Sequence, residues 1–307
     1  MSRRAVCRSA SLCLLTSLAA TTVHATNYAR GYFVDNVLLP TTSSEASSYA
    51  IDVDGNGSPD NSFGQVLAAL VGTGFDLTGT MGAAVASGSI VHLVHLQSID
   101  AAFKNDPAAQ ATWCIGVPTP TPPLFDGTDN ASCTDTSGTF VAALSSGSFT
   151  SPAPATNPNP VFLDIEIAVR TSSMTLNVQN ARLSFTTNGA GDITFGQING
   201  MIPHEDLLNT FPPTIAIACN DSIENDPAAD FSSTCKGIFD KGCSATPSFS
   251  GDGLIEVCEV TESSLMQSLL APDVQIVDNG STIYFNSLGI RFTAIAIDRV
   301  FASGFEP

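Results

Sequence analysis

The sequence predicts a mostly β fold with a few short helices, and the expected architecture is an antiparallel β-sandwich. Two observations favour this class. Segments in which apolar and polar residues alternate with a period of two recur along the chain, whereas amphipathic helical segments are few and short. Only 13% of the 307 residues are charged while 43% are hydrophobic, so the chain has enough apolar side chains to build a sizeable core.

The N-terminus predicts a cleavable signal peptide over residues 1–25. Three arginines precede a short apolar run, and the segment ends in Val23-His24-Ala25, which fits a small-x-small cleavage pattern. The run is too short to span a bilayer, and no later segment reaches the length of a transmembrane helix. We therefore expect an exported protein that is secreted, in the periplasm or outside the cell, or held at the cell surface.

The charge of the chain excludes some partners. Loss of residues 1–25 removes three arginines and no acid, which takes the formal charge from −18 to −21. Nucleic acids and anionic lipid surfaces would be repelled by such a protein. Calcium ions are compatible with this charge, as is a cell-surface or extracellular partner that the sequence does not identify.

Six cysteines remain after the signal peptide, and their even number in an exported chain predicts three disulfides. A zinc site does not fit, because the chain has no C-x-x-C pair and no nearby pair of histidines. We expect Cys114 to pair with Cys133, and the pairing of the later four stays open. Those four are Cys219, Cys235, Cys243 and Cys258.

Period-2 alternation predicts most of the strands, and the clearest case is Val161–Val169, where every second residue is apolar. Further strands are expected at Ile90–Leu96, Met174–Val178, Ala181–Phe185, Ile283–Phe285 and Leu288–Ile297. Helices are expected at Gly64–Val71, Pro203–Phe211 and Glu262–Leu270. Pro203 suits a first helical turn, and the acids at 205 and 206 suit its N-terminal dipole.

Proline-rich residues 151–160 divide the expected organisation, either as a linker or as a long surface loop within one domain. A mixed N-terminal half over 26–150 precedes this segment. A β-rich C-terminal half follows over 161–297, and residues 298–307 form a C-terminal tail.

Residues 52–60, Asp-Val-Asp-Gly-Asn-Gly-Ser-Pro-Asp, have the pattern of a calcium loop. Oxygen ligands fall at alternate positions, and Gly57 permits the sharp turn such a loop needs. The predicted ligands are Asp52, Asp54, Asn56, Ser58 through its carbonyl, and Asp60. Phe63 stands where a bidentate carboxylate is usual, which predicts a weaker site or one completed by an acid from elsewhere in the fold. A turn rich in Asp, Asn and Gly without metal is the alternative.

A second, degenerate loop runs from Ser248 to Glu259. Its predicted calcium ligands are Ser248, Ser250, Asp252, Leu254 through its carbonyl, Glu256 and Glu259. Serines replace the first two acids of the pattern, so a vestigial loop is an equally good interpretation. Cys258 lies inside the loop, and a disulfide there could hold what a metal once held.

Catalytic motifs are not evident in the sequence. It contains no G-x-S-x-G, no H-E-x-x-H and no phosphate-binding glycine loop. His92 and His95 are better interpreted as packed or hydrogen-bonded residues, and His204 as a capping or solvated one. Asp164 and Glu166 could pair as glycosidase carboxylates, although a solvated strand face is the simpler explanation for them. A secreted hydrolase with a site assembled from distant residues stays the alternative to a structural or binding protein.

Several segments together resemble a group of uncharacterised secreted bacterial proteins. In these, a D-x-D-G-[DN]-G-x-x-D-N loop is followed by a helix, a G-x-x-x-G-x-I-P segment, an EF-hand-like loop and an L-L-A-P-D-V segment. The matching segments here are Asp52–Asn61, Gly64–Val71 for the helix, Gly196–Pro203, Asp252–Glu259 and Leu269–Val274. The C-terminal Gly304-Phe305-Glu306 resembles a short terminal signature of some exported proteins. The resemblance implies export and calcium binding, and it implies no enzymatic activity.

Overall fold

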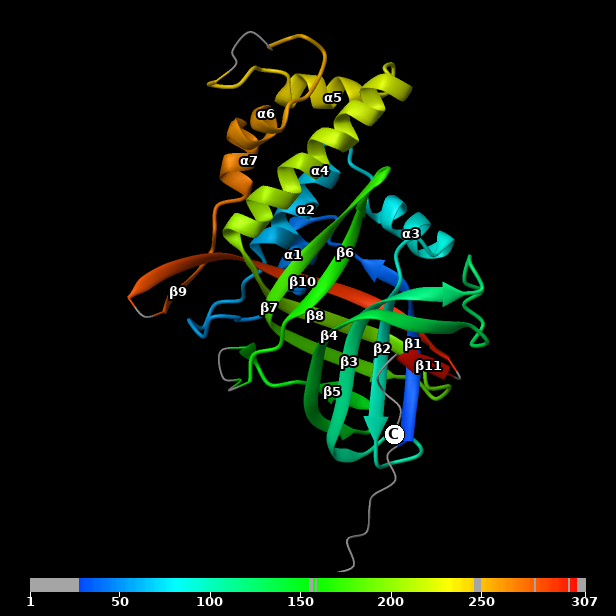
Figure 1. The fold of residues 1–307 in the computed structure, drawn as a ribbon. Coiled ribbons are helices and arrows are strands. Elements are labelled where there is room, and N and C mark those ends of the chain that lie inside the picture. The colour runs from blue at the N-terminus through cyan, green and yellow to red at the C-terminus, as the bar shows by residue number, and fades with distance from the viewer. Residues whose placement is uncertain are drawn as a thin grey trace, which may run out of the picture.

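The computed structural model describes residues 28–154, 157, 159–245, 250–278, 280–297 and 299–302. The predicted signal peptide over 1–25 and the terminal Gly304-Phe305-Glu306 signature lie outside the described residues. Within the described part, the prediction of a mostly β fold with antiparallel strands and a few helices is confirmed. The helices gather mainly at one end of the sheet (Figure 1).

The strands belong to one sheet. Their bounds are β1 Tyr28–Leu38, β2 His92–Ser98, β3 Asp106–Thr119, β4 Asn130–Ser145, β5 Ser148–Thr150, β6 Leu163–Val169, β7 Ser172–Thr187, β8 Ile193–Pro203, β9 Val274–Asp278, β10 Ser281–Ile297 and β11 Arg299–Ala302. The order is β1-β2-β3-β4-β5-β7-β8-β10-β9, with β6 paired to β7 and β11 paired in parallel to β4. Because β1 also pairs with β10, the sheet closes on itself.

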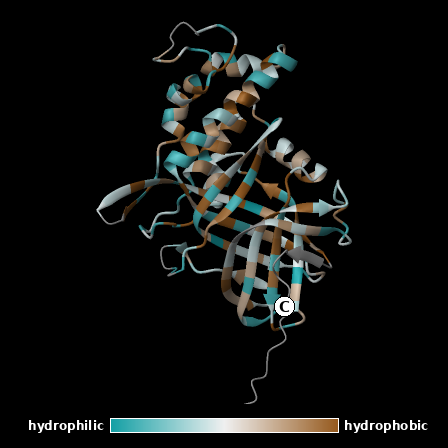
Figure 2. Cartoon of the chain, viewed as in Figure 1, coloured by the Kyte–Doolittle hydropathy of each residue, from teal (hydrophilic) through white to brown (hydrophobic). Residues whose placement is uncertain are grey.

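Side chains from opposite sides of the closed sheet meet in its interior, as they would between the layers of a sandwich. Tyr32 of β1 lies 6.3 Å from Phe185 of β7, and Trp113 of β3 lies 5.3 Å from Phe292 of β10, measured between ring centroids. Hydrophobic and hydrophilic residues alternate along these strands (Figure 2). The alternation is the period-2 pattern that the sequence shows, now with one face in the core.

Seven helices are present among the described residues, at α1 Ser43–Ser48, α2 Ser62–Gly72, α3 Leu77–Ser87, α4 His204–Asn225, α5 Asp230–Phe239, α6 Val257–Glu262 and α7 Ser264–Leu269. The predicted helix at Gly64–Val71 is α2, and the one predicted at Glu262–Leu270 corresponds to α7 and the end of α6. The helix that begins after Pro203 is much longer than predicted, because α4 continues through Pro212 and Pro213.

Residues 151–160 connect β5 to β6, and strands on both sides of this segment pair with each other. Ser148–Thr150 of β5 pair with Ser184–Thr186 of β7. β10, near the C-terminus, pairs with β1, near the start of the described chain. The N-terminal and C-terminal halves therefore contribute strands to the same sheet.

The six cysteines that follow the predicted signal peptide form three disulfides. Cys114–Cys133 joins β3 to β4, as the sequence predicts, with a Cα–Cα distance of 5.8 Å. Cys219–Cys235 joins α4 to α5, and Cys243–Cys258 joins the segment after α5 to α6, each with a Cα–Cα distance of 5.7 Å. Two of the three therefore hold the helical end of the molecule together.

Candidate metal centre

The predicted calcium loop, residues 52–60, lies between α1 and α2 and is closed at its base. The Asp60 N–H donates to the Ile51 carbonyl at 2.8 Å, which brings the two ends of the loop side by side. Gly55 and Gly57 have φ angles of +84° and +88°. Glycine reaches these left-handed conformations without the strain that a Cβ would bring, so both positions allow the chain to fold back.

Side chains within the loop are fixed by backbone N–H groups. Asp52 accepts from the N–H groups of Gly55 and Gly57 at 2.7 and 2.9 Å. Asp54 accepts from the Asn56 N–H at 3.0 Å, and Asn56 Oδ1 accepts from the Ser58 N–H at 2.7 Å. Hydrogen bonds within the loop thereby hold its polar side chains in place.

Three carboxylates of the loop converge. Oxygen atoms of Asp52, Asp54 and Asp60 lie within 4.8 Å of one another, a spacing at which the three groups could hold one metal ion. Within the described residues, no other group of three or more His, Cys, Asp or Glu side chains has this arrangement. The structure thus brings together three of the five residues predicted as ligands, and a fourth, Asn56, donates through Nδ2 to Asp54 at 3.0 Å.

Electrostatics in the loop favour a cation. Burial raises the pKa of Asp60, whose side chain is 9% exposed, and the charges of Asp54, Asp273 and Asp52 raise it further. In the part of the chain that the structure describes, the one ion pair is Arg170–Asp221, so no basic side chain neutralises these carboxylates. A bound cation would relieve their mutual repulsion.

The loop is attached to the sheet through Asn61, a buried residue that caps α2. Asn61 Oδ1 accepts from the Gly64 N–H at 3.1 Å and from the Gly289 N–H of β10 at 2.7 Å. Its Nδ2 donates to the Ala46 and Gly289 carbonyls at 2.9 and 3.2 Å. One amide therefore joins α1, α2 and β10 directly behind the carboxylate cluster.

Phe63, at the position of the usual bidentate carboxylate, belongs to the core. Its ring is fully buried and makes an edge-to-face contact with Phe211 of α4, with centroids 5.2 Å apart. The first turn of α2 therefore packs into the protein where a standard loop would present an acid to the metal.

Asp273 is an acid near the site that its position in the sequence did not predict. It lines, with Asp60, Asn61 and Ser62, a cavity of about 510 Å³. Its carboxylate accepts from the Ser62 hydroxyl at 2.7 Å, from the Ser287 N–H at 2.9 Å and from the Ser287 hydroxyl. These bonds tie Asp273 to the start of α2 and to β10, and its charge adds to the negative potential at Asp60.

In the second predicted loop, the carboxylates of the described residues accept hydrogen bonds from backbone N–H groups and do not converge on one point as those of the first loop do. Ser248 lies outside the described residues. Glu259, buried with 2% exposure, accepts from the N–H groups of Gly242 and Glu256, and Glu256 in turn accepts from the Glu259 N–H in a capping box. Asp252 accepts from the Leu254 N–H at 2.9 Å. Disulfide Cys243–Cys258 fastens this loop to the preceding segment.

Asp240 is a hydrogen-bond partner of the second loop that the sequence did not predict. Its carboxylate accepts from the N–H groups of Gly251 and Gly253 at 2.6 and 3.1 Å. It lies just after α5, outside the loop pattern, so no spacing rule could have linked it to that loop. The second loop therefore holds its shape through protein groups.

The histidines of β2 and the paired strand carboxylates lie in different environments. His92 and His95 are both buried, in agreement with their interpretation as packed residues. Asp164 accepts from Asn177 and Glu166 accepts from Ser173, each within the exposed face of the β6–β7 pair.

Comparison with protein-family models, with curated protein sequences and with solved structures gives no match to this chain. No single helix of the described chain is long and apolar enough to cross a membrane. The bent pair of α2 and α3, whose axes differ by 102°, meets the length and composition criteria only when the two are taken together.

Proposed function

We propose that this protein is an exported, disulfide-stabilised protein that binds calcium in the Asp52–Asp60 loop and has a structural or binding role. The observation that carries the proposal is the convergence of the Asp52, Asp54 and Asp60 carboxylates within 4.8 Å on a loop already ordered by its own hydrogen bonds. The resemblance of Asp52–Asn61 to a loop of uncharacterised secreted bacterial proteins supports the same assignment.

Calcium suits this donor set better than the other common metals. All the available donors are oxygens, which disfavours zinc and copper because these prefer nitrogen and sulfur ligands. Calcium accepts six to eight oxygens in irregular geometry, whereas magnesium demands a near-ideal octahedron and keeps several waters. A loop that supplies three carboxylates, the Asn56 side chain and the Ser58 carbonyl meets the calcium requirement, with water completing the shell.

The expected affinity matches an exported protein. Without a bidentate acid at position 63, we expect a dissociation constant on the order of 10⁻⁴–10⁻³ M, in the range of extracellular calcium modules. Calcium is abundant enough outside the cell to fill such a site. The three disulfides and the predicted signal peptide support the same location, because disulfides persist in oxidising compartments.

Calorimetric titration of the protein lacking residues 1–25 with calcium tests the proposal. We expect one site, with at least ten-fold weaker binding in Asp54→Asn, which keeps the side-chain shape but removes a charge. Asp164→Asn, on an exposed strand face, is the matched control and should bind as the parent does. A second site lost in Asp252→Asn would extend the proposal to the Ser248–Glu259 loop. Equal heats for Asp54→Asn and the parent would contradict the proposal.

A further inference from the structure

Strand β10 extends beyond the end of its neighbour β8. Pairing between the two ends at Phe285 opposite Pro203, after which the chain turns into α4. Residues Ser281–Tyr284 continue outward and pair only with β9, on their other side. In Figure 1, this part of β10 and β9 form an arm that projects past the start of α4. Four residues of β10 therefore have an open edge where β8 would have continued.

Alternate residues of an antiparallel strand turn their backbone N–H and C=O groups to the same side. Half of the backbone groups of Ser281–Tyr284 therefore face the open edge, and no described residue pairs with that edge. The side chains here are exposed as well, with Ile283 at 42% and Tyr284 at 45%. An unpaired strand edge of this kind is a template for another strand.

A cavity lies beside the open edge, where a longer β8 would have continued. It has a volume of about 340 Å³ and lies between the first residues of α4 and Thr282–Tyr284 of β10. His204 lines this cavity and also a second one of about 400 Å³, which α4 shares with α7 and the residues after it. The second cavity is lined by the apolar residues Leu208, Met266, Leu270 and Pro272 together with Thr261 and Gln267. His204 thus borders both the cavity at the open edge and this mainly apolar one.

Negative charge borders the open edge. Glu205 and Asp206 are exposed, line the first cavity and form no ion pair with any described residue. His204 Nδ1 lies 2.9 Å from Asn286 Oδ1. Because an amide oxygen only accepts, Nδ1 carries the proton in this contact, and Nε2 is the nitrogen available to the cavities. The site offers hydrogen-bond partners, an apolar pocket and uncompensated negative charge.

We propose that this slot binds an extended, basic peptide segment of a partner protein, which adds as a strand beside Ser281–Tyr284. Backbone hydrogen bonds to the open edge would provide affinity, and one apolar side chain would enter the second cavity. Lysine or arginine side chains of the segment would lie against Glu205 and Asp206. A second copy of this chain fits poorly, because both molecules carry a large negative charge.

The test uses a defined probe, acetyl-Lys-Val-Lys-Leu-Lys-Val-Lys-amide, added to the protein lacking residues 1–25. Hydrogen exchange should slow at Ser281–Tyr284. Two further versions carry N-methyl groups on the odd or on the even residues. Only one edge of an added strand bonds to β10, so one version should bind at least ten-fold more weakly and the other as well as the parent. Equal binding of all three, protection elsewhere, or no binding at millimolar peptide would overturn the proposal.

Charge variants provide a second readout. Joint replacement of Glu205→Gln and Asp206→Asn should raise the dissociation constant of the probe roughly five-fold at low salt. Glu224→Gln, at the exposed far end of α4, is the matched control and should change it less than two-fold. Measurements with calcium and with EDTA should agree, because the slot contains none of the proposed calcium ligands. An unchanged constant in the double variant would count against the charged part of the proposal.

Discussion

His92 is the first residue of β2 and is 1% exposed, and its ring lies 5.0 Å from the Trp113 ring, with the two ring planes tilted by 30°. The Glu166 N–H donates to its Nε2 at 3.1 Å, which places the proton of the neutral ring on Nδ1. Burial lowers the pKa of His92 from 6.5 to about 3. The folded protein therefore keeps this side chain neutral at pH values where the unfolded chain binds a proton.

Acid should destabilise the protein through His92. The pKa is lower in the folded state than in the unfolded state, so stability is full above about pH 6.5 and falls as the pH drops towards 3. The free energy of unfolding should fall by at most about 1.4 kcal/mol per pH unit. Between pH 7 and pH 5 the total decrease should be roughly 2 kcal/mol. Urea unfolding at pH 5, 6 and 7 measures it. In His92→Gln, the change of unfolding free energy with pH should decrease by the amount that corresponds to about one bound proton. An unchanged pH dependence would exclude His92 as the cause.

Asn61 should contribute more to stability than its single side chain suggests. Replacement by alanine removes the cap of α2 and leaves two carbonyls and the Gly289 N–H without their partner. We expect Asn61→Ala to lower the free energy of unfolding by about 3 kcal/mol. Asn61→Asp keeps the two accepted bonds but turns a carboxylate oxygen toward the Ala46 and Gly289 carbonyls, so we expect it to destabilise the protein as well. Chemical denaturation measures both, and a loss below about 1 kcal/mol in the alanine variant would refute this role.

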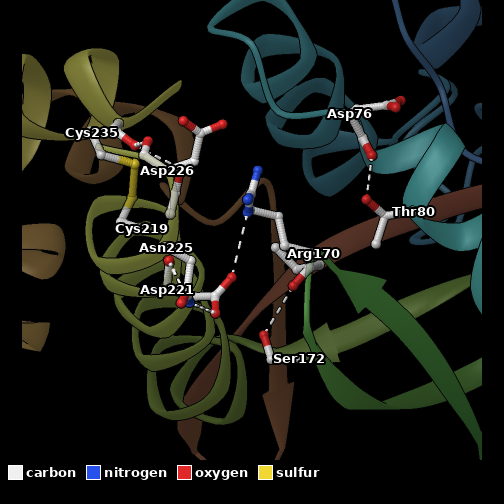
Figure 3. A network of polar contacts seen from close by, with 12 residues as sticks. Asp76, Thr80, Arg170, Ser172, Cys219, Asp221, Asn225, Asp226 and Cys235 are labelled. Carbon is white, nitrogen blue, oxygen red and sulfur yellow. Dashed lines mark hydrogen bonds and ion pairs between the residues drawn. A yellow bond between two sulfur atoms is a disulfide. The ribbon is translucent and has the colours of Figure 1, made fainter. Parts of the chain in front are cut away.

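Arg170 joins the tip of the β6–β7 hairpin to the helical end of the molecule. Its guanidinium lies 3.9 Å from the Asp221 carboxylate of α4 and 4.9 Å from the centre of the Phe231 ring of α5. Figure 3 shows Arg170 reaching across to α4, close to disulfide Cys219–Cys235. The residue has a φ of +54°, a left-handed conformation that an arginine adopts at some energetic expense.

Two variants separate the contacts of Arg170 from its backbone conformation. Arg170→Ala removes the ion pair and the ring contact and keeps the strained φ, so we expect a loss of about 1 kcal/mol. Arg170→Gly removes the same contacts but relieves the strain, and should be about 1 kcal/mol more stable than the alanine variant. Unfolding midpoints in urea compare them, and a glycine variant less stable than the alanine variant would contradict this assignment.

At the scale of elements, local pattern predicted the positions of many strands but not their continuity. The separate strands predicted at Met174–Val178 and Ala181–Phe185 form one strand, β7, with a register shift between Gln179 and Arg182 and a left-handed Asn180. An inserted residue of this kind interrupts the alternation without ending the strand. Helix α4 shows the reverse case, because Pro212 and Pro213 favour an end to the helix, yet α4 continues to Asn225.

At the scale of the whole molecule, the closed sheet could not be predicted, because closure depends on the pairing of β1 with β10, which lie at opposite ends of the chain. The candidate metal site was more accessible to sequence analysis. Its carboxylates lie within nine consecutive residues, so spacing alone indicated which of them converge. The residues that hold the loop in place could not be predicted, because Asp273 and Gly289 are distant in sequence and come close to it only in the folded protein.

The attachment of the loop to the whole molecule predicts that calcium stabilises the fold and not the loop alone. Val53 of the loop is buried in a small cluster with Met201, Val274 and Phe285, and Asn61 bonds to β10. Local order in the loop therefore depends on strands from the C-terminal half. A ligand that binds only the folded loop stabilises the protein by about 2.7 kcal/mol at a concentration one hundred times its dissociation constant.

The most direct test is the thermal unfolding midpoint with saturating calcium and with EDTA, for the protein lacking residues 1–25 and for its Asp52→Ala variant. We expect a midpoint several degrees higher with calcium than with EDTA in the parent protein. In Asp52→Ala the midpoint should be the same in both solutions. A parent midpoint that does not respond to calcium, or an equal response in Asp52→Ala, would contradict the assignment of the Asp52–Asp60 loop as a calcium site.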